Sequence, residues 1–107
     1  MPEVARKDSK DTVNSPDGSG ICCASPAVHS TANGSSTVFV NGIGVVRKDD
    51  PMIVHPFPGP PCCSIHAPKL SSFSSSVFAN GLNLGRKGDV YSAHVISSGS
   101  SDVFAGG

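Results

Sequence analysis

Two stretches of the chain, Ser36–Asp50 and Ser75–Asp89, carry the same short pattern of apolar and polar residues. In each, a run of mainly β-branched and aromatic residues, Val38-Phe39-Val40 or Val77-Phe78-Ala79, is followed at once by Asn-Gly. Asn-Gly beside such a run favours a two-residue hairpin, because a type I′ turn needs a positive φ at both of its central residues. We therefore predict a β-hairpin in each stretch.

Half of the same unit is found at each end of the chain. Ser101–Gly107 matches the first strand and the turn, whereas Val4–Asp8 matches the second strand. Because the halves complete each other, we predict a third hairpin formed from residues 1–9 and 99–107. The prediction is one all-β domain, residues 1–107, in which three hairpin units form a ring. Equivalent places around its pseudo-threefold axis belong to Phe39, Phe78 and Phe104.

The segments that connect the hairpins are Ser9–Ser35, Pro51–Ser74 and Val90–Ser100. None shows an apolar period of 3.6 residues, so we expect little or no helix. The first is rich in turn-forming residues, and six prolines exclude helix from most of the second. All four histidines and all four cysteines lie in these connectors, and none lies in a hairpin strand.

Composition limits what such a chain can be. At 107 residues with 12 Gly, 9 Pro, five Phe and no Trp, the core is small and needs a staple: disulfides, a metal or a larger partner. Eight Lys and Arg balance eight Asp and Glu, so no basic surface field favours nucleic acid as a partner. The charged segment Met1–Lys10 has no apolar core of a signal peptide. We expect synthesis in the cytoplasm.

The histidines are the candidate metal ligands. His55 and His94 each lie five residues after the aspartate that ends a hairpin unit, so the ring would bring them to matching places. His29 and His66 each follow a Cys-Cys pair at a similar spacing. Four imidazoles from these loops could converge on one tetrahedral ion, and zinc is the usual occupant of such a site. A closed shell of four protein ligands would make this metal structural.

The state of the cysteines is open at this point. Cys62 or Cys63 could replace one histidine as a ligand, since adjacent residues of an extended chain point opposite ways. Alternatively the four cysteines, which include Cys22 and Cys23, are small buried hydrophobic residues. A disulfide between the two connectors is the third option, and cytoplasmic synthesis argues against it.

These residues resemble the PAAR-repeat family, the tip proteins of the central spike in contractile phage tails and type VI secretion systems. Both hairpin units follow the family pattern from start to end, Ser100–Gly107 follows its opening, and Glu3–Asp8 its close. The resemblance thus covers the whole chain. Of the namesake Pro-Ala-Ala-Arg only the arginine is kept throughout, as Arg6, Arg47 and Arg86.

The resemblance implies a small β cone, stapled by one metal near its vertex, that caps a trimeric β-helical spike with one copy per trimer. It implies a structural tip that helps to pierce a target membrane, and not an enzyme. Such a protein is assembled on the spike and delivered to the target cell envelope. The family's usual ligands are three His and one Cys. Here they would fall on His55, His94, His66 and Cys62 or Cys63, with zinc as the metal and iron as a possible occupant.

Two other functions compete with this one. A small zinc hydrolase or deaminase would need a general base, but Glu3 is the only glutamate and no His-Glu-x-x-His motif is present. A secreted binding module held together by disulfides would need no more than four cysteines, but a signal peptide is missing. Sequence alone does not distinguish a phage tail from a secretion system.

Overall fold

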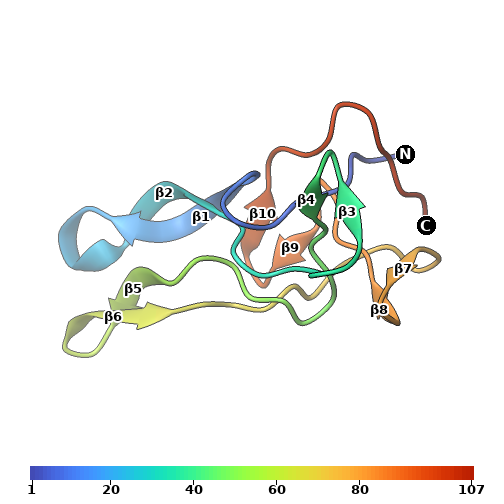
Figure 1. Cartoon of the computed structure of the whole chain (residues 1–107). Helices are drawn as coiled ribbons and strands as arrows, with labels where there is room; N and C mark the ends of the chain where they lie inside the picture. The colour runs from blue at the N-terminus through green and yellow to red at the C-terminus, as the bar shows by residue number, and fades with distance from the viewer.

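The computed structural model describes residues 1–107 and is built from short β-strands (Figure 1). The only helical segment is a single 3-10 turn, η1 (Ile21–Cys23), and no helix is long and apolar enough to cross a membrane. The prediction of an all-β chain with little or no helix is therefore confirmed. The ten strands are β1 (Thr12–Ser19), β2 (Ser25–Ser30), β3 (Phe39–Val40), β4 (Ile43–Gly44), β5 (His55–Gly59), β6 (Cys62–His66), β7 (Phe78–Ala79), β8 (Leu82–Asn83), β9 (Val90–Tyr91) and β10 (His94–Ile96).

The two predicted hairpins are present, as β3–β4 and β7–β8. Their turns have the positive φ values that the Asn-Gly pairs predict: 54° and 77° at Asn41 and Gly42, and 56° and 77° at Asn80 and Gly81. Both central residues of each turn thus lie in the left-handed region that a type I′ turn requires.

The connectors are more regular than the sequence suggests. Ser9–Ser35 contains the β1–β2 hairpin, which joins β10 and β9 in an antiparallel sheet of order β2-β1-β10-β9. Along β1 the buried residues Val13 and Ser15 alternate with exposed ones. Because one of the two buried residues is a polar serine, the sequence shows no alternation of apolar and polar residues here. Pro51–Ser74 contains the β5–β6 hairpin. Reading these segments only as connecting loops was therefore incomplete.

Three backbone hydrogen bonds form a closed cycle among the three chain segments that were predicted to be equivalent. The N–H of Ala5 donates to Gly85, that of Gly85 to Val46, and that of Val46 back to Ala5, with N···O distances of 3.0, 2.8 and 3.0 Å. The chain termini pair with each other, because Val4 donates to Val103 at 3.0 Å and Ala105 to Pro2 at 3.0 Å. The N-terminal segment thus pairs with the C-terminal segment and is hydrogen-bonded to both complete hairpin units.

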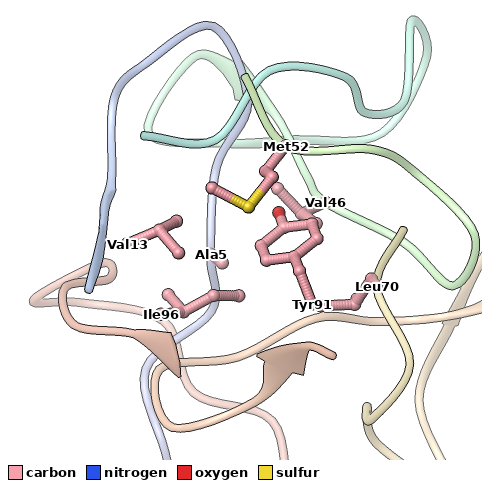
Figure 2. Close-up of a cluster of buried hydrophobic side chains, with 7 residues drawn as sticks. All are labelled: Ala5, Val13, Val46, Met52, Leu70, Tyr91 and Ile96. Atoms are coloured by element: carbon pink, nitrogen blue, oxygen red, sulfur yellow. The ribbon is translucent and has the colours of Figure 1, made fainter. Parts of the chain in front are cut away.

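The molecule is elongated, with extents of 40 × 23 × 22 Å. The β1–β2 and β5–β6 hairpins project at one end, which we call the apex, and β7–β8 and both termini lie at the other, which we call the base (Figure 1). The core has two parts. The part under the repeat hairpins comprises Val4, Val40, Val45, Ala79, Leu84 and Ala105. The part below the four-stranded sheet comprises Ala5, Val13, Val46, Met52, Leu70, Tyr91 and Ile96 (Figure 2).

Tyr91 is the largest side chain of this second cluster and is fully buried. Its hydroxyl points toward Met52 and has no hydrogen-bond partner (Figure 2). Burial raises the pKa of Tyr91, and the negative charges of Asp50 and Asp11 raise it further. The ring therefore serves as a neutral packing element between the sheet and the repeat hairpins.

Candidate metal centre

Four side chains from three parts of the chain meet between the two projecting hairpins. Asp17 comes from β1, His55 from β5, His66 from the end of β6 and His94 from β10. One ligand atom of each lies within 4.8 Å of those of the other three, so the group could hold a metal ion. Because β10 pairs with β1 and β5 with β6, the sheet and the second hairpin together bring these residues to one point.

The distances within the group match a tetrahedral shell. Around the Nε2 atom of His55, the Nε2 atoms of His66 and His94 lie at 2.7 and 3.0 Å, and Oδ1 of Asp17 at 3.1 Å. Oδ1 of Asp17 is 3.4 Å from His94 Nε2 and 3.7 Å from His66 Nε2. Ligands about 2.0–2.1 Å from a zinc ion stand roughly 3.3–3.4 Å apart at the corners of a tetrahedron. These five separations bracket that value, and every pair of ligand atoms in the group lies within 4.8 Å.

Backbone carbonyls fix the orientation of the two buried rings. Nδ1 of His55 lies 3.1 Å from the carbonyl oxygen of Ile53, and Nδ1 of His94 lies 3.0 Å from that of Tyr91. An Nδ1–H that donates to a carbonyl leaves Nε2 with a free lone pair, which is the tautomer a metal needs. Both Nε2 atoms face the group. The rings are therefore held as metal ligands would be, with only 3% of each residue exposed.

Asp17 is held as a carboxylate. Its burial raises its pKa, but the Ser15 hydroxyl, which donates to Oδ1 at 2.9 Å, and the charges of His94 and His66 lower it more, so the net pKa lies below the ordinary value. Burial and the neighbouring His55 lower the pKa of His66. At neutral pH the group therefore offers an anionic oxygen beside a neutral imidazole, and these are the protonation states in which both residues bind metals.

Only three of the four histidines that were predicted as metal ligands belong to the group. It brings His55, His66 and His94 together with a carboxylate that the sequence did not single out. His29 lies beside the group but is not part of it: its ring stacks on His55 with centroids 4.2 Å apart, and its Nε2 atom lies 3.3 Å from the backbone oxygen of Asp17. His29 thus supports His55 and the β1 turn from outside.

A two-residue insertion hid Asp17. In the complete hairpin units the arginine pairs with an aspartate three residues later, as in Arg47–Asp50, but Arg6 pairs with Asp11, five residues later. Counting five residues from Asp8 or Ser9, as the alignment suggests, leads to Val13 or Asn14. Counting five from Asp11 leads to Pro16, next to Asp17. The insertion becomes visible only through the Arg6–Asp11 pair, which the structure shows.

The prediction of a cysteine ligand was wrong. Two disulfides, Cys22–Cys62 and Cys23–Cys63, join the turn of the β1–β2 hairpin to the start of β6, and no cysteine is free. The thiol groups are therefore not available as ligands in this state. Three of the four residues are exposed, which also contradicts their description as small buried hydrophobic residues. The argument from cytoplasmic synthesis failed because it concerns where a protein is made and not which sulfur atoms the fold brings together.

Comparison with known proteins adds no assignment. Neither a scan against protein-family models nor a search of curated proteins finds a match to this chain. The candidate metal centre therefore has to be interpreted from its own geometry.

Proposed function

We propose that the chain is the structural tip of a contractile injection machine, a phage tail or a type VI secretion system, in which it caps a trimeric β-helical spike. The proposal rests on the resemblance to the PAAR-repeat family described above. The observation that best supports it is the closed cycle of hydrogen bonds among Ala5, Val46 and Gly85, because one chain then offers three similar units to a partner with three identical chains.

Side-chain contacts form a second cycle among the same three units. The Arg6–Asp11, Arg47–Asp50 and Arg86–Asp89 pairs each bring a charged nitrogen to 2.9 Å from a carboxylate oxygen. The Nη1 atom of each arginine then reaches the turn of the next unit: Asn41 at 3.1 Å, Asn80 at 3.1 Å and the carbonyl of Gly106 at 3.2 Å. These contacts support an approximately threefold arrangement that is closed by the two chain ends.

The three equivalent phenylalanines supply an apolar docking surface. Phe39, Phe78 and Phe104 expose 57%, 55% and 45% of their surface, although phenylalanine is usually well buried. Three exposed aromatic rings on equivalent strands match the end of a three-chain β-helix better than they match solvent. Because the chain has no formal net charge, we expect this contact to depend only weakly on salt.

In this proposal the cluster of Asp17, His55, His66 and His94 holds one structural zinc ion, and iron is the alternative occupant. Aspartate takes the place that a cysteine has in the family's usual ligand set, and zinc accepts a carboxylate oxygen at about the same distance as an imidazole nitrogen. Four protein ligands leave no open position for a reacting water, so the ion would not be catalytic. It would tie the two projecting hairpins to β10 and stiffen the end that meets the target membrane.

The test of the proposal is the stoichiometry with the spike. Mixing the chain with the spike trimer encoded beside it and weighing the complex by native mass spectrometry should give one copy per trimer at low and at moderate salt. Phe39→Asp/Phe78→Asp should weaken this complex strongly, whereas Ile21→Asp at the exposed apex should leave it unchanged. Three copies per trimer, or no complex at either salt concentration, would contradict the assignment.

The two disulfides give the secreted binding module a specific observation in its favour. Four cysteines in two bonds are what that alternative requires. It does not require a metal or a trimeric partner, however, and it gives no reason for three exposed phenylalanines in equivalent places. Metal content and the spike complex therefore separate the two functions.

A further inference from the structure

The apex carries a second group of metal-ligating atoms, separate from the cluster of Asp17, His55, His66 and His94. We propose that, in the reduced chain, Cys22, Cys23, Cys62 and Cys63 bind one thiophilic divalent cation of the zinc class. We further propose that oxidation to the two disulfides expels this cation. Oxidation would therefore replace a metal cross-link between the two hairpins by two covalent cross-links.

The backbone brings the four cysteines close enough together to share one ion. The bonded pairs have Cα–Cα distances of 4.8 Å for Cys22–Cys62 and 5.8 Å for Cys23–Cys63. Within each Cys-Cys pair the Cα atoms are about 3.8 Å apart, the fixed distance across a trans peptide bond. In a tetrahedral zinc–thiolate site the sulfur atoms stand about 3.8 Å apart, at Zn–S distances of about 2.3 Å. Breaking the S–S bonds and rotating the side chains would reach that spacing without a large backbone movement.

The two cysteine pairs differ in local conformation. Cys22 and Cys23 have φ values of 53° and 58°, so their side chains do not alternate across an extended strand. Each is paired with a cysteine of β6, and both pairs have the same order along the chain. The two bonded pairs thus lie side by side. Because Cys62 and Cys63 are adjacent on β6, their side chains must rotate toward a common ion once the S–S bonds are broken.

The site is distinct from the His/Asp cluster. On β6 the cluster residue His66 and the first cysteine, Cys62, are four residues apart, which is about 13 Å along a strand. Cys22, Cys62 and Cys63 are exposed, so a cation reaches the thiols from solvent. No charged residue lies between Gly18 and Val28 or between Pro56 and Ile65 in the sequence.

The chemistry balances with one named co-reactant. Four thiols that bind a divalent cation release four protons. In the second step a thiolate attacks an oxidant of the disulfide class and forms a mixed disulfide, and its partner thiolate then displaces the oxidant as a dithiol. Forming each protein disulfide transfers two electrons to one oxidant molecule, whose two released thiolates take up two protons from water. After two such reactions no thiolate remains, and the cation leaves.

Cobalt(II) tests the proposal because thiolate ligands give a charge-transfer absorption in the near ultraviolet that imidazole and carboxylate ligands do not. Reduced wild-type protein should bind two Co²⁺ per chain and show this absorption, whereas oxidised protein should bind one and show none. Reduced His55→Ala should keep the absorption after the other site is lost, so failure of the metal centre in the proposed function is distinguishable from failure here. Reduced Cys22→Ser/Cys62→Ser should keep about half of it.

Alkylation provides a second readout that does not depend on the spectrum. One equivalent of Zn²⁺ should protect all four thiols of the reduced chain from iodoacetamide, as counted by mass spectrometry, and the protection should disappear in guanidinium chloride. Absence of both the charge-transfer absorption and the protection would overturn the proposal, whether the reduced chain is folded or not. Equal absorption in denatured protein would also overturn it, because the site would then owe nothing to the fold.

Discussion

Removing one of the two apex disulfides should destabilise the protein far less than half as much as removing both. Each bond closes a loop between residues 40 positions apart, for which the loop-entropy model gives about 4 kcal/mol at 25 °C. Because the bonds join two pairs of adjacent cysteines, either bond alone keeps the same loop closed in the unfolded chain. We expect a loss of about 1 kcal/mol or less for a single bond, and about 4 kcal/mol for both.

The comparison needs four proteins: the wild type, Cys22→Ser/Cys62→Ser, Cys23→Ser/Cys63→Ser and the variant with all four substitutions. Urea unfolding followed by circular dichroism, without reductant and with a chelator present, gives each free energy of unfolding. The chelator matters because a bound metal would also hold the two hairpins together. Additive losses, about 2 kcal/mol for each bond, would refute the shared loop. So would a fourfold variant that is as stable as the wild type.

Three further predictions concern the fold and its pH response. Ser35→Ala should lower the free energy of unfolding by about 1–3 kcal/mol, since the buried Ser35 hydroxyl accepts hydrogen bonds from the N–H groups of Thr37 and Val38 at 3.1 and 2.8 Å. The control is Ser36→Ala at an exposed residue, and an equal loss of stability in both variants would contradict the argument. Metal-free protein should lose stability as the pH falls below about 6.5. The pKa values of His29 and His66 are lowered in the folded state, so the unfolded chain takes up the protons first, at most about 1.4 kcal/mol per pH unit for each; stability that is flat from pH 7 to 5 would be inconsistent with this. Deleting Met1–Asp8 removes the partner of Val103 and breaks the backbone cycle, so amide exchange around Val103 should accelerate and the protein should aggregate; unchanged protection in a soluble product would disprove the closure.

The features that were predictable from sequence are local turns and contacts that the repeat implies. Asn41-Gly42 and Asn80-Gly81 select the hairpin turn within a few residues, whatever the rest of the chain does. The pairing of the two chain ends was also predictable, because Val4 and Val103 match residues that are hydrogen-bonded in each complete unit. The internal repeat thus predicted a contact between segments far apart in the chain, which a single hairpin could not have done.

The features that the sequence did not predict depend on how segments far apart in the chain align with one another in space. His55, His66 and His94 could be nominated from residue type and spacing, but Asp17 follows an insertion whose length only the Arg6–Asp11 contact reveals. A disulfide between the two connectors was considered and argued against, and its pairing was open for another reason. Four cysteines allow three pairings, and the choice among them depends on which hairpin turns lie side by side.

Metal content tests the central claim most directly. Elemental analysis of purified protein should find one transition-metal ion, zinc by our account, in each oxidised chain. His55→Ala should lose the ion and melt at a lower temperature, because binding energy at such a site is also folding energy. His29→Ala should keep the ion, since His29 only stacks beside the cluster. A wild-type chain without metal, or a His55→Ala chain that retains a full equivalent, would contradict the account.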